Sequence, residues 1–260
     1  MPAMPAIERV SAQLLVRLRV GVPAELARLL DALEADPVLA PTHWGEARGV
    51  RDPYDRAALL AAVAAAPPEG IVPEVRRTRP LRYTAHWYPA ADRSLSAVDL
   101  ETTLVPDAAT AHAFFDAAAR LAAALPLDFG HVDVRLAGQP NDTKLKRGTS
   151  FHHVDGYCRQ GPDALFARNF FGPRLVALVG RGDRDEGARL LAAAGGAAAP
   201  LGDGGVRLDL VPEPWAAEPA ALKAAQAATD ARLRPTGVLA EPVNRWEFGP
   251  GARWERPVPA

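Results

Sequence analysis

The sequence predicts an α+β protein in which helices pack on one face of an antiparallel sheet. Several segments alternate apolar and polar residues, as half-buried strands do. Others place apolar residues every three or four positions, as amphipathic helices do. Across residues 1–137 these segments follow the order strand, helix, two strands, helix, strand, which is typical of a split βαβ (ferredoxin-like) half. A second, smaller α/β half is predicted over residues 149–260.

The first strand is predicted at Leu14–Val20, where leucine and valine alternate with arginine. An amphipathic helix over Leu26–Leu33 follows, and Asp36-Pro37 ends it because the residue before a proline disfavours helical geometry. We expect a loop at His43 and Trp44, and then a second, short helix over Tyr54–Val63.

The middle of the chain completes the first half. Residues Leu81–Val105 predict two antiparallel strands joined by a polar turn near Asp92. Pro106-Asp107 opens the next helix, since proline is well tolerated at the start of a helix. After Pro126, a strand with apolar residues on one face runs to Leu136.

A polar loop, Gly138–Gly148, separates the two halves, which pack together or form one continuous domain. Beyond it we predict a helix that carries Phe166 and Phe170, is interrupted at Gly172-Pro173 and resumes over Leu175–Val179. A second helix is predicted over Asp183–Ala194, where Gly195-Gly196 ends it. A hairpin turn at Gly202–Gly205 then precedes a strand over Val206–Leu210, and a last helix runs from Pro219 to Leu233.

The composition and charge of the chain exclude several classes of function. Hydrophobic residues make up 48% and charged residues 23%, a globular balance. Thirty basic residues against 31 acidic ones give a net charge of -1, which supplies no overall attraction to nucleic acid or anionic lipid. Cys158 is the one cysteine in the sequence, so an intrachain disulfide and a Cys-rich zinc module are excluded. Without a signal-peptide pattern or a long apolar segment, we expect a cytoplasmic protein that binds neither nucleic acid nor membrane.

One cluster of histidines and aspartate could carry chemistry. His153-x-Asp155 could supply two ligands of a facial metal triad, but no histidine follows His153 in the sequence. The pair His131-x-Asp133 could also supply two ligands, with His152 or His153, about twenty residues later, as the third. Such a triad usually takes its third ligand from a distant strand instead. The simpler interpretation is a turn at the seam of the halves, with imidazoles that are hydrogen-bonded or exposed, or a partner-binding surface.

Other catalytic patterns are weaker still. Asp99 and Glu101 share one face of a strand and could form an acid/base pair, but alternating solvated positions explain them more simply. Cys158 is predicted to be an inert thiol. The glycine-rich turn at Gly202–Gly205 lacks the lysine and hydroxyl residue of a phosphate-binding loop. We therefore predict no catalytic residue, no cofactor and no metal ligand, and no enzymatic activity.

Two stretches resemble a known family. The run from Phe170 to Gly180 resembles the "aromatic/Leu-Gly-Pro-x-Leu-Val-x-x-Leu-Gly" run of immunity proteins of type VI secretion and polymorphic toxin systems, the type VI immunity family. The family's pattern continues through the turn at Leu201–Gly205 to a close at Leu233-Arg234-Pro235. Near the N-terminus, a helix followed by Asp36-Pro37 and by Trp44 is similar to a related immunity group.

The resemblance is best over roughly the last hundred residues and looser over the first sixty, and the middle of the chain is unmatched. The family usually has a second glycine after the position of Gly180, whereas this chain has Arg181. The resemblance implies a cytoplasmic α+β protein that binds and blocks one cognate secreted toxin, often a nuclease, by occlusion rather than catalysis.

The resemblance supplies no contact residues, so the docking prediction comes from the chain itself. We place the partner-binding surface at the polar loop and the histidine cluster; its residues are Lys144, Arg147, His152, His153, Asp155 and Tyr157. The alternatives are a metal-dependent enzyme that uses His152, His153 and Asp155, and a scaffold that binds a protein other than a toxin.

Overall fold

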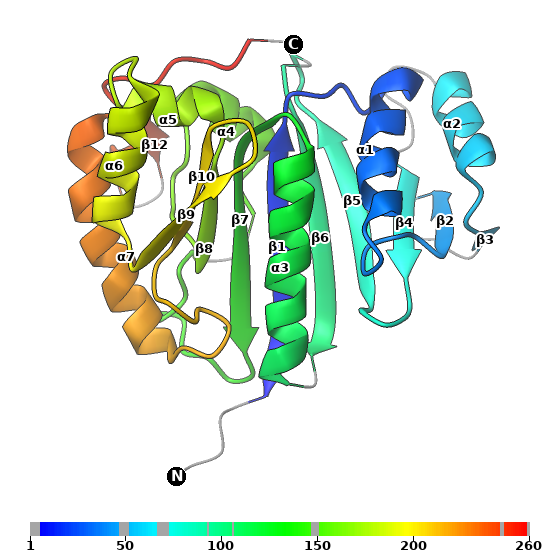
Figure 1. Cartoon of the computed structure of the whole chain (residues 1–260), viewed down its shortest axis with the longest axis horizontal. Helices are drawn as coiled ribbons and strands as arrows, with labels where there is room; N and C mark the ends of the chain where they lie inside the picture. The colour runs from blue at the N-terminus through cyan, green and yellow to red at the C-terminus, as the bar shows by residue number, and fades with distance from the viewer. Residues whose placement is uncertain are drawn as a thin grey trace.

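The computed structural model describes residues 6–46, 52–66, 73–92, 94–105, 107–146, 151–244 and 247–258. A ten-stranded sheet runs through this part of the chain in the order β3-β2-β4-β5-β6-β1-β7-β8-β10-β9, and its neighbouring strands are antiparallel (Figure 1). The strands are β1 (Ile7–Val16), β2 (His43–Glu46), β3 (Asp52–Pro53), β4 (Pro73–Arg77), β5 (Tyr83–Pro89), β6 (Ser96–Val105), β7 (Leu127–Leu136), β8 (Arg168–Phe171), β9 (Ala197–Leu201) and β10 (Gly205–Asp209).

Seven α-helices accompany the sheet in the described ranges, so the predicted α+β class with an antiparallel sheet is confirmed. They are α1 (Pro23–Ala35), α2 (Arg56–Ala65), α3 (Ala108–Ala124), α4 (Val154–Gln160), α5 (Pro173–Val179), α6 (Arg184–Ala194) and α7 (Pro219–Leu233). A 3₁₀ turn (Arg234–Thr236) follows α7, and β11 (Glu241–Pro242) pairs with β12 (Phe248–Gly249) in a separate ribbon. None of these helices is both long and apolar enough to cross a bilayer.

β1 lies at the centre of the sheet, between β6 and β7, and its side chains from Val10 to Val16 are buried on both faces. The predicted half-buried strand at Leu14–Val20 was therefore wrong in its bounds and in its burial. The alternating Arg17 and Arg19 lie beyond the end of β1, whereas the polar residues inside this strand, Ser11 and Gln13, are each 1% exposed. The hydrogen-bonding partners of Gln13 come from β6 and from the distant segment at His152, which local periodicity cannot show.

Helices α1 and α3 cover one face of the sheet (Figure 1). Both were predicted. Asp107 caps α3 by accepting a hydrogen bond from the Thr110 N–H at 2.7 Å, which satisfies one of the free amides at the helix start. The apolar stripe of α1 is fully buried and consists of Leu26, Leu29, Leu30 and Leu33. Burial of such a side chain contributes about 2 kcal/mol, so these stripes fix both helices on the sheet.

The opposite face of the sheet is covered in part by α4 and the chain around it. The rings of His152 and Tyr157 lie 5.5 and 5.9 Å from the ring of Phe129, whose side chain points away from α3. The prediction that helices pack on one face only is therefore wrong. Polar residues of β1 and β7 face this side, and they need hydrogen-bonding partners that solvent does not supply once the strands are buried.

The predicted helix carrying Phe166 and Phe170 is instead strand β8. Asn169 fixes a tight turn before it, because its side chain bonds both the N–H and the carbonyl of Phe166, at 2.9 and 2.7 Å. β8 then pairs with β7, with Phe171 opposite Phe129, and with β10 on its other side. This pairing joins the strands of residues 1–137 and 149–260 into one sheet.

Strand β2 occupies the expected loop at His43 and Trp44, and β4 pairs with it through Trp44 and Val75. The predicted strands β5, β6, β1 and β7 lie next to one another in that order, and β4, β2 and β3 extend the sheet beyond β5. β4, which carries Arg76 and Arg77, therefore lies inside the sheet rather than at its edge.

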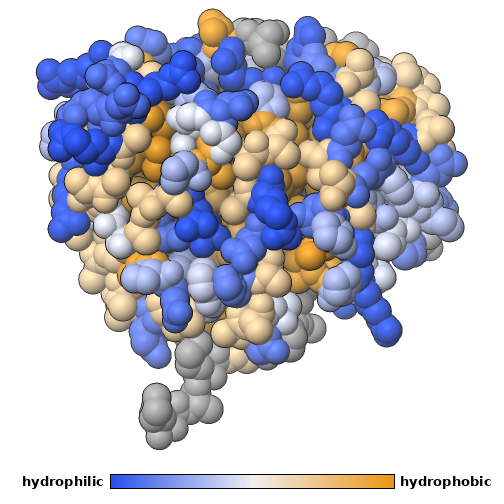
Figure 2. Space-filling model, in the orientation of Figure 1, coloured by the Kyte–Doolittle hydropathy of each residue, from blue (hydrophilic) through white to orange (hydrophobic). Residues whose placement is uncertain are grey.

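The later elements agree with their predictions. α5 begins at Pro173, α6 ends before Gly195, the β9–β10 hairpin turns at residues 202–204, and α7 spans Pro219–Leu233. Asp183 caps α6 by accepting hydrogen bonds from two backbone amides. On the side of the molecule seen in Figure 2, hydrophilic side chains gather over α6 and the turn before it.

A buried ion pair stabilises the packing of α3 on β8 and β10. The guanidinium of Arg168, 2% exposed, bonds the carboxylate of Asp209 at 2.6 and 3.1 Å and the carbonyl of Phe115 at 3.1 Å. It also lies over the rings of Phe115 and Trp215, at 5.2 and 5.6 Å. Since both charges are desolvated, either one alone would be costly.

We expect Asp209→Ala to lower the free energy of unfolding by about 3–5 kcal/mol, because the buried Arg168 charge loses its hydrogen-bonded counter-ion and keeps only Asp116, which is 3.7 Å away. Urea denaturation monitored by circular dichroism measures this loss. Replacing both partners, as in Arg168→Met with Asp209→Leu, should recover most of it. Glu186→Ala breaks the exposed pair with Arg189 and serves as the control that leaves stability unchanged. An Asp209→Ala protein as stable as the control would contradict this role.

Candidate functional site

The sheet face opposite α1 and α3 carries rows of polar side chains. In the first row, His86 of β5 lies beside Asp99 of β6, and Asp99 lies beside Gln13 of β1. Gln13 in turn lies beside His131 of β7. The second row consists of Thr84, Glu101, Ser11 and Asp133. Because alternate residues of a strand share one face, the antiparallel register alone assembles this surface.

Gln13 connects this face to the segment that covers it. Its Nε2 donates to Asp99 Oδ1 at 2.9 Å and to the carbonyl of His152 at 3.1 Å. Its Oε1 accepts a hydrogen bond from the His152 N–H at 2.7 Å. The carboxamide therefore binds the backbone of His152 in the way that a neighbouring strand would, and it fixes residues 151–166 on the sheet.

His152 is buried among aromatic rings and donates from Nδ1 to Asp163 at 2.7 Å. Burial lowers the pKa of its imidazole, and the hydrogen bond to Asp163 opposes this shift. Burial alone would raise the pKa of Asp163, but the hydrogen bond from His152 and the charge of Lys146, 2.8 Å away, lower it below the ordinary value. His131 lies 5.2 Å from His152, ring centre to ring centre, and stacks on Phe166 at 3.7 Å.

Asp99 was predicted to be solvated, and this was wrong: it is 7% exposed. Burial raises the pKa of its carboxyl to about 7; the charge of Glu101 also raises it, and the hydrogen bond from Gln13 lowers it. A carboxyl group in this environment exchanges its proton near neutral pH. Strongly perturbed groups of this kind are more frequent at functional sites than elsewhere.

The part of the polar face over β4, β5 and β6 is open. Tyr88 is 43% exposed, and its ring stacks loosely on His86 at 6.4 Å. His86 Nδ1 is 2.8 Å from Glu74 Oε1, and Arg9 pairs with Glu101 at 3.2 Å. The burial of Tyr88 and the charges of Asp99, Glu74 and Glu101 raise the pKa of its hydroxyl. This open area, defined by Glu74, His86, Tyr88 and Glu101, is called the polar sheet face below.

A pocket of about 350 Å³ lies at one end of this face and includes Lys144. Side chains of both charges line it: Glu8, Arg9, Glu101, Arg135 and Lys144. Lys144 Nζ donates to Asn141 Oδ1 at 2.7 Å, so its charge has no carboxylate opposite it in this contact.

The predicted docking residues separate into buried and accessible ones. Tyr157 is 1% exposed and donates to Asp128 at 2.7 Å, and His152 is 4% exposed, so neither can touch a partner directly. The prediction that His152 and Tyr157 contact a partner is therefore wrong: both side chains are buried under the segment that covers the sheet. His153 is exposed and Lys144 half-buried, and Arg147 lies outside the described residues.

The cluster of His152, His153 and Asp155 does not converge on one point. His152 binds Asp163, whereas Asp155 Oδ1 accepts a hydrogen bond from the N–H of Ala91 at 2.8 Å. Across the described residues, no three His, Cys, Asp or Glu side chains are close enough to hold a metal ion together. Asp155 instead connects α4 to the end of β5, which places the start of α4 beside the polar sheet face.

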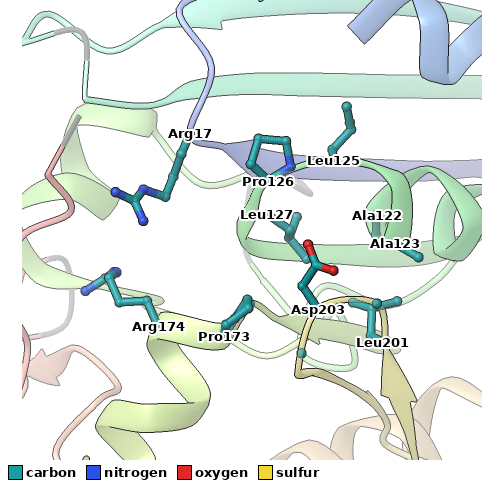
Figure 3. Close-up of a pocket in the computed structure, with 13 residues that line it drawn as sticks. Arg17, Ala122, Ala123, Leu125, Pro126, Leu127, Pro173, Arg174, Leu201 and Asp203 are labelled. Atoms are coloured by element: carbon teal, nitrogen blue, oxygen red, sulfur yellow. The ribbon is translucent and has the colours of Figure 1, made fainter. Parts of the chain in front are cut away.

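A second pocket, of about 180 Å³, lies at the far end of β1, between α3, α5 and the β9–β10 turn (Figure 3). Arg17 and Arg174 lie on one side of it, and Asp203 points into it from the hairpin (Figure 3). Arg17 donates to the carbonyl of Val258 at 3.1 Å, and Arg174 pairs with Asp128 at 2.7 Å. These arginines thus hold the last described residues and the start of α5.

Sequence reasoning missed Glu74, His86 and Tyr88. The alternation in β5 and β6 could have revealed two of them, because it puts His86 and Tyr88 on the same face as Asp99. That alternation indicated a polar face, but it gave no sign that the covering segment would come from residues 151–166.

No family model matches the chain, and no curated protein matches it either. Among solved structures, the Pseudomonas aeruginosa type VI secretion system (T6SS) protein PA0821 is similar, with a TM-score of 0.59 and 14% sequence identity. The match covers 90% of this chain and 77% of that protein. At this identity the likeness concerns the fold.

We expect the stability of the protein to depend on the ionisation of Asp99. The pKa of Asp99 is about 7 in the folded state and about 3.8, the ordinary value, in the unfolded state. The folded state therefore holds the proton more tightly, and stability falls as the pH rises from about 4 to about 7. Asp99→Asn keeps the acceptor for Gln13 without the charge. It should be as stable as the wild type near pH 4 and more stable above pH 7, by up to roughly 4 kcal/mol at 1.36 kcal/mol per pKa unit.

Urea denaturation from pH 4 to pH 8 tests this. The matched control is Asp142→Asn, which alters an exposed carboxyl in the loop after β7 and should follow the wild type at every pH. If Asp99→Asn and wild type keep a constant difference in stability across this range, Asp99 does not titrate as inferred.

Proposed function

We propose that this chain is an immunity protein: it binds one cognate secreted toxin and blocks it by occlusion rather than by catalysis. The structural likeness to a T6SS protein over 90% of the chain is the observation that supports this best. The run from Phe170 to Gly180, which resembles the type VI immunity family, points the same way. This run forms the end of β8 and all of α5.

The polar sheet face is the docking surface that we propose for the toxin. Tyr88 offers an exposed aromatic ring on a rigid strand, the type of side chain that dominates binding energies at interfaces. His86 and Glu101 on either side are already paired with Glu74 and Arg9. Because these contacts exist before binding, little side-chain freedom is lost when a partner docks.

Asp155 lies at the end of β5 and Lys144 lines the pocket beside Glu101, so these two residues of the predicted docking set border the face; His153 is exposed at the start of α4. Occlusion needs a preformed complementary surface and no reactive group. The metal-dependent enzyme is the weaker alternative, because His152 and Asp155 are each bound to separate partners.

We expect a secreted toxin to be encoded beside this gene, and we expect cells that express that toxin to survive when they also express this chain. Tyr88→Ala should weaken the complex by about 30-fold, the effect of losing a contact of about 2 kcal/mol, and should reduce survival. Isothermal titration calorimetry with the purified toxin gives the affinity, and colony counts give the protection.

Val243→Ala is the control, since Val243 is an exposed apolar residue, 69% accessible, on the β11–β12 ribbon. It should bind and protect like the wild type. Failure of the wild-type chain to protect cells would refute the immunity function. Full protection by Tyr88→Ala would instead show that the toxin docks somewhere other than the polar sheet face.

A further inference from the structure

A groove of about 650 Å³ lies between α5 and the chain that follows β12, away from the polar sheet face. Leu178 and Trp254 give it an apolar floor, and Arg181 and Arg253 line it with positive charge. Glu255 adds one negative charge. The groove therefore combines a small apolar area with guanidinium groups, which suits a ligand that carries carboxylates next to an apolar side chain.

Arg174 holds the floor of the groove in place. Its guanidinium bonds both oxygens of Asp128 at 2.7 Å and the carbonyl of Glu255 at 2.6 Å. It also lies 4.8 Å from the ring centre of Trp254, in a cation–π contact. Its charge is thus neutralised by Asp128, so the cations left for a ligand are Arg181 and Arg253.

Arg181 has an unfavourable backbone conformation. It follows α5 with a φ of 59°, in the left-handed region that glycine adopts freely and other residues rarely do. Its N–H donates to the carbonyl of Leu178 at 3.2 Å, and the N–H of Gly182 donates to that of Ala177 at 2.7 Å, which is the usual glycine-capped helix end. Glycine at position 181 would satisfy the same hydrogen bonds with less strain.

The arginine side chain does not offset that strain within the described part of this chain. Arg181 is exposed and Arg253 is half-buried, and neither guanidinium makes a hydrogen bond or ion pair with any residue described. A strained residue whose side chain is unused in the fold is a candidate for a contact with another molecule.

We propose that this groove binds an acidic segment of a partner protein, with carboxylates on Arg181 and Arg253 and an apolar side chain on Leu178 and Trp254. A protein segment fits better than nucleic acid. Two unpaired cations beside Glu255, in a chain of net charge -1, are fewer than phosphate binding needs. The inference goes beyond the immunity function and does not require the partner to be a toxin.

Fluorescence anisotropy with two labelled peptides tests the proposal. The acidic probe has four Glu-Glu-Leu repeats, and the neutral probe has four Gln-Gln-Leu repeats. The wild-type chain should bind the acidic probe about tenfold more tightly than the neutral one, and added salt should weaken that binding.

Arg181→Gly should weaken binding of the acidic probe about fivefold, because it removes one charge-assisted contact. The same change should raise the melting temperature by roughly 2 °C, since it relieves the strain at the end of α5. Lower affinity together with higher stability cannot come from unfolding. Arg181→Lys keeps the charge and should retain most of the binding, and Arg253→Ala should weaken it as Arg181→Gly does.

Arg184→Ala is the matched control, because Arg184 is an exposed arginine of α6 that does not line the groove. It should bind the acidic probe like the wild type. The proposal is overturned by wild-type affinity in both Arg181→Gly and Arg253→Ala, or by equal binding of the acidic and neutral probes. Tighter binding of a twelve-nucleotide oligothymidine than of the acidic probe would assign the groove to nucleic acid instead. None of these outcomes bears on the immunity function, which the toxin experiment tests.

Discussion

The carboxamide of Gln13 lies on the central strand of the sheet, shielded from solvent, and forms hydrogen bonds with Asp99 and with both backbone groups of His152. A buried amide without such partners would destabilise the fold by about 1–3 kcal/mol for each group left unsatisfied. The covering segment must therefore dock in one register, with the backbone of His152 against β1. This constraint fixes the start of α4, and with it the boundary between the covered and the open part of the polar face.

The molecule has two candidate binding surfaces, which differ in their chemistry. The polar sheet face is rigid because its side chains belong to strands and are already paired, as Glu74 is with His86. The groove beside α5 has a fixed floor, with Trp254 held by Arg174, and two arginines without partners among the described residues. A protein that binds by occlusion needs such preformed surfaces more than it needs reactive groups. The strain at Arg181 costs stability, and a contact with another molecule would offset that cost.

The helices could be predicted to within a few residues where local signals coincide. Asp107 and Asp183 cap α3 and α6, and Pro219 begins α7, because capping and proline geometry act over one helical turn. The same local reasoning failed at β8, where Phe166 and Phe170 are four residues apart, as in a helix. There, Asn169 closes a turn, and pairing with β7 and β10 imposes the extended conformation.

By itself, the sequence determined the α+β class, the position of most helices, and the shared strand face of Asp99 and Glu101. Only the tertiary structure decided that Asp99 is buried and that its pKa is raised. It also decided that His152 and Tyr157 lie in the interior while His153 is exposed. The left-handed conformation of Arg181 likewise appears only in the structure. The reason is physical. Periodicity and capping depend on residues within a few positions of one another, whereas burial and hydrogen-bond partners depend on segments more than a hundred positions apart, as Gln13 and His152 are.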